Sequence, residues 1–197
     1  MADSFFTIEK EGKAIFKEKM SKFISFAVKV TSPEEAKAVV KKIQNEYHDA
    51  RHVCWAYMIG PDRNDWQLND NGEPSGTAGK PILGQINSFN LTDVMVVVVR
   101  YFGGIKLGTS GLIAAYREAA RLALEDAGIL EMHKMETINF SFPYMVANDV
   151  MKLVKSEELE VINRNFDNAC EMTVTFREDN APRIKERLKK IEGLSFF

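Results

Sequence analysis

The chain has 197 residues, 45% of them hydrophobic, and a formal net charge of −2. This length allows one large domain or two small ones, and the apolar content is sufficient for packed cores. A charge this close to zero excludes a globally basic protein that attracts nucleic acid or anionic membrane through its overall field. No apolar run approaches the roughly 20 residues that span a bilayer and no secretory leader opens the chain, so we expect a cytoplasmic protein without a membrane partner.

The first half of the chain alternates between strand and helix signals. Apolar and polar residues alternate over the first thirty positions and are interrupted by Gly12, which predicts strands joined by a turn. Thr31 or Ser32 is the expected N-cap of a helix that has Pro33 in its first turn and ends near Tyr47. Residues 52–60 then predict a strand, and residues 66–68 predict a short partner for it.

Residues 69–86 combine turn chemistry with two carboxylates. Asn71-Gly72 and the segment 74–76 are typical turn sequences, and Thr77 is the expected cap of the short helix that follows. Asp70 and Glu73 lie within this turn region, and the second of them precedes Pro74 directly. The stretch therefore places charged side chains at a bend of the chain.

The chain is organised around residues 93–118. Residues 94–99 are six consecutive apolar side chains, mostly β-branched, and they predict a strand buried on both faces. A glycine-rich loop follows, and from Leu112 the apolar positions recur with helical spacing. Thr109 or Ser110 is the expected N-cap of this helix, and Gly128 is the residue expected to end it.

The last third of the chain has a different order of elements. The patterns predict strands over 137–142, 159–166 and 170–176, helices from about 146 to 154 and from about 180 to 191, and a final strand over 194–197. Residues 167–169 are a hairpin candidate between two of the strands. This strand–helix–strand–strand–helix order is that of a ferredoxin-like α+β domain. We therefore expect two domains, residues 1–130 and 136–197, that meet at 128–136.

Strand, glycine-rich loop and helix N-terminus together form the usual arrangement of an anion site, because backbone N–H groups and the helix dipole point to one place. The Walker A and dinucleotide fingerprints are both absent. Two interpretations remain open: the loop contacts an anion or an RNA phosphate, or its glycines serve only a tight crossover. The candidate binding residues are Arg100, Tyr101, Phe102, Gly103, Gly104, Lys106, Gly108, Thr109 and Ser110.

A second candidate patch surrounds the turn region and includes His52, Asp70, Glu73, Ser75 and Thr77. The carboxylates are potential ligands of a hard cation, but the calcium-loop pattern fails and a solvated turn is the favoured interpretation. His52 and Cys54 share one strand face, which fits either a thiolate–imidazole pair or two ordinary neighbours. Cys54 and Cys170 have no metal-ligand spacing and fall in different predicted domains, so we expect free thiols and assign no metal and no cofactor.

Two motifs at a specific spacing resemble the IMPACT/YigZ family. They are NDNGEPSGTAGKPIL, residues 69–83, and RYFGGIKLGTSGLIAAY, residues 100–116, with HVCWAY ahead of them at 52–57. The resemblance covers about residues 17–128, and the remainder is more loosely similar to the C-terminal domain of bacterial members. It implies an α/β domain of the ribosomal protein S5 domain 2 type followed by a ferredoxin-like α+β domain, as in domains IV and V of elongation factor G.

The resemblance also implies a role in translation regulation and stress response, with RNA or the ribosome as partner. The leading hypothesis is therefore a non-enzymatic, translation-associated regulator that binds RNA or the ribosome through the glycine-rich loop. The alternative is an enzyme, hydrolase- or peptidase-like or acting on a phosphorylated substrate, with Asp70 and Glu73 opposite the loop 100–106. Convergence of these carboxylates and the loop on a closed pocket favours the enzyme, and an open face favours the binder.

Overall fold

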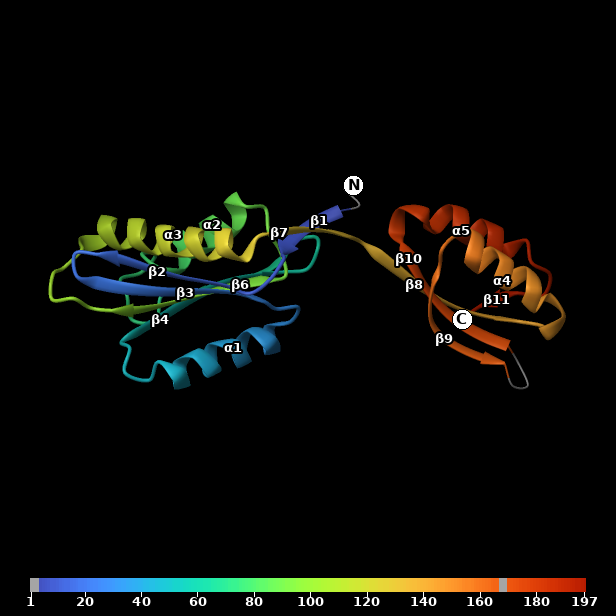
Figure 1. Ribbon diagram of the computed structural model, residues 1–197, viewed down its shortest axis with the longest axis horizontal. Helices are drawn as coiled ribbons and strands as arrows, with labels where there is room; N and C mark the ends of the chain where they lie inside the picture. Colours follow the sequence, from blue (N-terminus) through green and yellow to red (C-terminus); the bar gives the residue numbers. More distant parts are fainter. Residues whose placement is uncertain (1–3, 167–169) are drawn as a thin grey trace. The chain divides into compact units, whose positions relative to one another are not determined.

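The computed structural model describes residues 4–166 and 170–197, and the hairpin candidate 167–169 lies outside them. The chain forms two compact units. We call residues 5–132 the N-terminal unit, and residues 133–197 together with residue 4 the C-terminal unit. The architecture is α+β, because each unit combines an antiparallel sheet with helices that cover it (Figure 1).

The N-terminal unit is built on a five-stranded antiparallel sheet. Its strands, in spatial order, are β2 (Gly12–Glu18), β3 (Ser21–Lys29), β6 (Val94–Tyr101), β4 (His52–Ile59) and β5 (Asp65–Asn69). Two further strands, β1 (Ser4–Ile8) and β7 (Ile129–His133), pair with each other in a separate two-stranded sheet.

Helices cover both faces of the five-stranded sheet. Helix α1 (Pro33–Glu46) packs on one face, and α2 (Gly79–Ser88) and α3 (Gly108–Ala127) pack on the other (Figure 1). Along the central strand β6, Val94, Val96 and Val98 belong to the core under α2 and α3. The alternate residues, Met95, Val97 and Val99, belong to the core under α1. All six are fully buried, which confirms the predicted two-sided strand.

The ends of the helices confirm some of the expected caps and correct others. Ser32 caps α1 by accepting a hydrogen bond from the Glu35 amide, and Gly128 ends α3 at a φ of +70°. Thr109 and Ser110 were wrong as N-caps. Helix α3 begins at Gly108, whose φ of +71° turns the chain into the helix before either hydroxyl is reached.

Thr77 is likewise not the cap of α2. Its hydroxyl donates to the Pro74 carbonyl at 2.6 Å, while the Asp70 carboxylate accepts from the amides of Ala78 at 3.1 Å and Gly79 at 2.8 Å. An upstream carboxylate thus satisfies the first free N–H groups of this helix and also suits its positive end.

The C-terminal unit has ferredoxin-like topology. Strand β8 (Met135–Phe142) leads through a 3-10 turn, Tyr144–Val146, into α4 (Ala147–Ser156), which is followed by β9 (Glu160–Phe166), β10 (Cys170–Arg177), a second 3-10 turn (Glu178–Asn180), α5 (Ala181–Lys189) and β11 (Ser195–Phe196). The sheet order is β11-β8-β10-β9. This is the β-α-β-β-α-β arrangement expected from the sequence, with its core between sheet and helices.

Both cysteines are buried and free, as predicted: Cys54 lies in the N-terminal unit and Cys170 in the C-terminal unit. Within the described residues, no helix has the length and apolar character needed to cross a membrane.

Candidate functional site

The strand register of the N-terminal unit brings the two sequence motifs together. His52, the first residue of β4, pairs directly with Arg100 near the end of β6. Because side chains on a strand alternate between faces, His52, Cys54 and Arg100 all lie on the sheet face that α2 and α3 cover. The turn region 70–77 follows β5 and enters α2 on this same face.

A buried ion pair joins the two motifs. The Arg100 guanidinium donates from Nη1 to Glu73 Oε1 at 2.7 Å, and the two side chains are 8% and 3% exposed. The Tyr116 hydroxyl of α3 donates to the same carboxylate oxygen, also at 2.7 Å. Arg100 Nε is buried without a partner among the described residues. Strand, turn and helix are therefore held together by one carboxylate.

Cys54 is part of this network and is not an activated thiol. Its sulfur lies 2.9 Å from the Asp70 carbonyl, to which it donates, and 3.4 Å from the Tyr116 hydroxyl. Burial raises the pKa of the Cys54 thiol to about 12 and also raises the pKa of Tyr116. His52 uses Nδ1 to donate to the Asn71 carbonyl at 2.9 Å, so the structure gives the His52 and Cys54 side chains separate partners.

Asp70 serves the turn itself. Its carboxylate accepts from the amides of Gly76, Ala78 and Gly79 at 2.8 to 3.1 Å. Burial opposes ionisation of this carboxyl, but the three N–H donors prevail and hold the pKa of Asp70 below its usual value. Within residues 4–166 and 170–197, no group of three or more His, Cys, Asp or Glu side chains is placed to hold a metal ion.

An open concavity of about 390 Å3, here called the loop pocket, lies above the ion pair. It is lined by Arg51, His52, Glu73, Pro74, Arg100, Phe102, Lys106, Leu107, Gly108, Thr109 and Leu112. Phe102 is 49% exposed, and its ring centre lies 5.7 Å from the Arg100 guanidinium carbon beneath it. The pocket thus combines exposed cations, an aromatic face and the N-terminal turn of α3.

Several candidate residues do not line the loop pocket. Tyr101 points to the opposite face of the sheet, where its hydroxyl donates to Asp49 at 2.7 Å and this bond raises its pKa to about 12. Gly103 packs against the turn between β2 and β3, and its amide donates to Ser21 Oγ at 3.3 Å, so this N–H is already engaged. The remaining candidates outside the lining are Gly104, Ser110, Ser75, Thr77 and Asp70.

The sequence interpretation missed four lining residues, Arg51, Pro74, Leu107 and Leu112. A usable signal for Arg51 was its position, because it immediately precedes His52, the first residue of β4. Leu107 and Leu112 carried none, since Leu112 was expected only on the apolar stripe of the helix and Leu107 was given no role.

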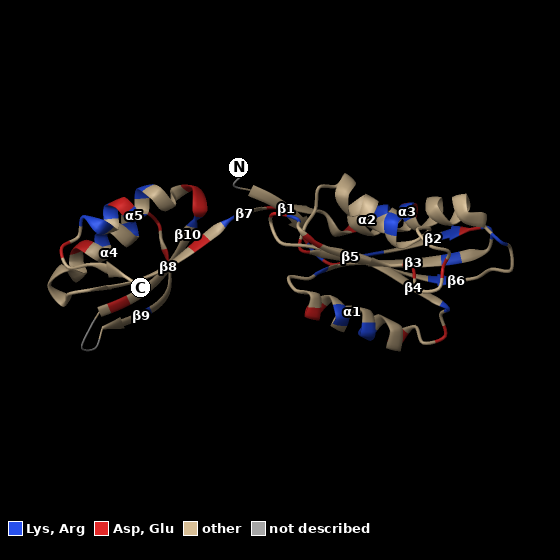
Figure 2. Ribbon diagram, turned by 180° about the vertical axis from the view of Figure 1, so that it is seen from behind, with Lys and Arg blue, Asp and Glu red and all other residues tan. Residues whose placement is uncertain are grey.

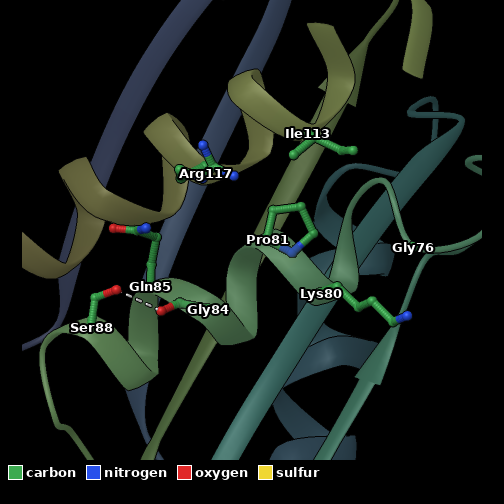
Figure 3. Close-up of a pocket in the computed structure, with 8 residues that line it drawn as sticks. All are labelled: Gly76, Lys80, Pro81, Gly84, Gln85, Ser88, Ile113 and Arg117. Carbon is green, nitrogen blue, oxygen red and sulfur yellow. Dashed lines mark hydrogen bonds between the residues drawn. The ribbon is translucent and has the colours of Figure 1, made fainter. Parts of the chain in front are cut away.

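A second concavity of about 320 Å3, here called the helix groove, runs between α2 and α3. Figure 3 shows Lys80 from the first turn of α2 and Arg117 from α3 on its two sides, with Ser88 bonded to the Gly84 carbonyl. The other lining residues are Gly76, Pro81, Gln85 and Ile113. Pro74 lines the loop pocket and Gly76 lines the helix groove, so only the short turn around Ser75 separates the two concavities.

Comparison with known proteins places the chain in a family. Residues 19–124 match the Impact N-terminal domain. IMPACT family member YvyE of Bacillus subtilis is 34% identical over 183 residues, which cover 92% of this chain and 84% of that protein. IMPACT family member YigZ of Escherichia coli is 35% identical over 150 residues, which cover 75% of this chain and 74% of that protein.

A solved structure titled "Crystal structure of an hypothetical protein" resembles the whole chain, with a TM-score of 0.77, 28% identity and coverage of 100% of this chain and 98% of the other. The fold and the sequence similarity therefore agree over both units. The Impact N-terminal domain match includes every residue that lines the loop pocket and the helix groove. The chain belongs to the IMPACT family.

Proposed function

We propose that the chain is a translation-associated regulator and that its N-terminal unit binds the RNA of the ribosome. The phosphates lie along α3 from the loop pocket to the helix groove. The observation that carries this proposal is the pair of basic concavities on either side of one turn. A repeating anion such as the RNA backbone can occupy both, whereas a small phosphorylated ligand needs only one.

The cations of this surface are available for an anionic partner. Arg51, Lys106, Lys80 and Arg117 are exposed, and none of them has an ion pair within the described residues. Figure 2 shows Lys and Arg on α2 and α3 and in the segment that follows β6. The neighbouring carboxylates are internally satisfied, because Glu73 holds Arg100 and Asp70 holds three amides. The local field is therefore positive although the net charge of the chain is −2.

The loop pocket also offers a surface for a base. The exposed Phe102 ring has the buried Arg100 guanidinium on its inner side, which leaves its outer side for stacking. Stacking does not require one particular base, so we expect structured RNA to be selected by shape, with unpaired nucleotides placed over Phe102.

The same geometry weakens the case for an enzyme. That alternative needs Asp70 and Glu73 as free carboxylates facing the loop, and both are engaged within the protein. Glu73 reaches the pocket only as the partner of Arg100, and Asp70 lies outside the lining. The binding proposal requires neither carboxylate to ionise or to hold a metal.

The test is sedimentation of the purified protein with ribosomal subunits through a sucrose gradient at low and at physiological salt. We expect the wild type to migrate with a subunit and the double variant Arg51→Ala/Lys106→Ala to remain at the top. Lys29→Ala is the matched control, because Lys29 is an exposed lysine opposite Val94, at the far end of the strands that carry the pocket. Wild-type protein that stays at the top at both salt concentrations refutes the proposal. If Lys29→Ala loses as much binding to the subunit as the double variant, the association depends only on nonspecific charge and the proposal is refuted.

A further inference from the structure

The opposite face of the N-terminal sheet contains a smaller cavity of about 200 Å3 between α1 and strands β4 and β5. We call it the α1 pocket. It is lined by Pro33, Ala36, Lys37, Val40, Lys41, Gln44, Trp55, Tyr57 and Gln67. None of these residues lines the loop pocket or the helix groove, so a ligand held here is independent of the anion surface described above.

Tyr57, one of the residues that line the α1 pocket, has an unsatisfied hydroxyl. Tyr57 is 2% exposed, and its hydroxyl has no hydrogen-bond partner among the described residues. A buried hydroxyl without a partner lowers the stability of the folded state, and such groups are rare in folded proteins. A ligand that presents a hydrogen-bond acceptor to the cavity removes this cost.

The walls of the pocket fit a flat ring. Trp55 and Tyr57 are stacked with their ring centres 6.0 Å apart and their planes within 3° of each other. Pro33, Ala36 and Val40 of α1 provide apolar side chains to the same cavity. A planar ring that enters between helix and sheet gains apolar and aromatic contact on its faces. The volume is below the roughly 300 Å3 at which sites for drug-sized ligands begin, which favours one ring over a fused pair.

Charge around the pocket is divided. Lys37 and Lys41 are exposed, lie one turn apart on α1 and have no ion pair within the described part of the chain. Near Tyr57 the charge is negative: burial raises the pKa of this phenol, and the carboxylates of Glu34 and Asp65 raise it further. A complementary ligand has an anionic group for the lysines and a ring that carries a hydrogen-bond acceptor for the Tyr57 hydroxyl.

We propose that the α1 pocket binds a pyrimidine nucleotide. The ring carbonyl accepts from the Tyr57 hydroxyl, the ring packs against Trp55, and the phosphate lies at Lys37 and Lys41. The nucleotide is either a free ligand or a residue of an RNA strand, because the chemistry recognised is the same.

The first experiment is calorimetric titration of the full chain with uridine monophosphate, uridine and adenosine monophosphate. We expect uridine monophosphate to bind at least tenfold more tightly than uridine, which lacks the phosphate, and than adenosine monophosphate, which has a larger ring. No heat with uridine monophosphate at millimolar concentration overturns the proposal, as does equal affinity for the three ligands.

Variants distinguish a ligand site from a packing defect. Tyr57→Phe removes only the unpartnered hydroxyl, so the melting temperature should stay the same or rise while affinity for uridine monophosphate falls about tenfold. Lys37→Ala/Lys41→Ala should bind uridine and uridine monophosphate equally, whereas Lys29→Ala should match the wild type. Unchanged affinity in Tyr57→Phe overturns the assigned orientation and with it the proposal.

An oligouridylate of six nucleotides identifies the source of the ligand. If the oligomer binds more tightly than the mononucleotide, and Lys37→Ala/Lys41→Ala abolishes this difference, the pocket is assigned to an RNA strand. Equal binding assigns it to the free nucleotide. Because Arg51 and Lys106 are absent from the lining of the α1 pocket, the Arg51→Ala/Lys106→Ala variant should retain the mononucleotide site even if the ribosome proposal fails.

Discussion

The loop pocket has a buried floor and an exposed rim, and the two are built from different chemistry. On the floor, Glu73 and Arg100 are buried, and the Glu73 carboxylate accepts hydrogen bonds from Arg100 and from the buried Tyr116. On the rim, Arg51 and Lys106 are exposed and have no ion pair within the described residues. Removing one partner of a buried charged pair lowers stability strongly, whereas exposed unpaired charges contribute little to stability and remain available for a partner.

This contrast makes the floor a part of the fold and the rim the candidate binding surface. A variant of the floor should therefore lower stability first, and binding only as a consequence. A variant of the rim should lower binding at unchanged stability. The predictions below test this separation.

The largest effect is expected for Glu73→Ala. It leaves the Arg100 guanidinium, 8% exposed, buried without its counter-charge and removes the acceptor of Tyr116, so the free energy of unfolding should fall by about 3 to 5 kcal/mol. The urea midpoint measures this. Glu157→Ala in the C-terminal unit is the comparison, because the Glu157 side chain is 2% exposed but the side chains of its partners Arg183 and Arg187 are 58% and 45% exposed.

The Arg partners of Glu157 can return to water, so we expect Glu157→Ala to cost only about 1 to 2 kcal/mol. A larger loss in Glu157→Ala than in Glu73→Ala contradicts the assignment of the pocket floor to the fold. The double variant Glu73→Met/Arg100→Met sharpens the test, because replacing both charges by apolar groups should recover most of the stability lost in Glu73→Ala.

The second prediction concerns the loop glycines between floor and rim. A Cβ on Gly103 meets the Met20 carbonyl carbon at 2.0 Å, so Gly103→Ala should cost about 3 kcal/mol through displacement of the β2–β3 turn. Gly104 has a φ of +89° and open space around it, so Gly104→Ala should cost only about 1 kcal/mol of backbone strain.

Gly84→Ala is the matched control, because Gly84 lies within α2 with open space around its Cα and should gain about 1 kcal/mol from better helix propensity. Thermal unfolding followed by circular dichroism ranks the three variants. If Gly103→Ala and Gly104→Ala lower the melting temperature equally, the backbone at Met20 can move away from a Cβ at position 103.

The third prediction is a dependence of stability on high pH. The thiol of Cys54 ionises near pH 9 when unfolded, but burial holds its pKa at about 12 in the folded chain. Between these values the folded state binds more protons than the unfolded state, so stability falls as pH rises, by about 1.4 kcal/mol per pH unit for this group. Below pH 9 the contribution is fully present.

Urea midpoints of wild type and Cys54→Ala at pH 8, 9, 10 and 11 isolate this group, since the lysines and tyrosines titrate in both proteins. We expect the wild type to lose stability more steeply than Cys54→Ala above pH 9. Parallel curves would show that water reaches the thiol.

Most of the fold could be predicted because its signals are local. The six apolar residues of β6, the Ser32 cap and Gly128 each report on their own segment, and all three were confirmed. The strand–helix order of the C-terminal unit followed from the same kind of periodicity. What failed was the capping of α2 and α3, because the residues that decide it, Asp70 and Gly108, lie outside the positions at which hydroxyl caps are sought.

The site could be predicted only as two motifs. Which face a side chain occupies depends on strand register, and register is set by pairing across 48 positions between His52 and Arg100. Because neighbouring residues of a strand point to opposite faces, Tyr101 lies on the α1 face and Arg100 on the α3 face. No local pattern in the sequence distinguishes the two faces. The sequence also did not indicate that Arg100 is the partner of Glu73, since this contact joins a turn to the end of a distant strand.

The smallest effect on stability is expected for Lys106→Ala, and it is the sharpest test of the rim. Lys106 is exposed and has no ion pair within the described residues, so unfolding should change by less than about 0.5 kcal/mol. If its ammonium contacts one phosphate, binding to ribosomal RNA should weaken, and the slope of log affinity against log salt should flatten by about 0.7 to 0.9. Fluorescence anisotropy with labelled RNA between 50 and 200 mM salt measures both, with Lys29→Ala as the control. A slope equal to that of wild type means that Lys106 touches no phosphate, and the glycine loop then serves only to lead the chain from β6 into α3.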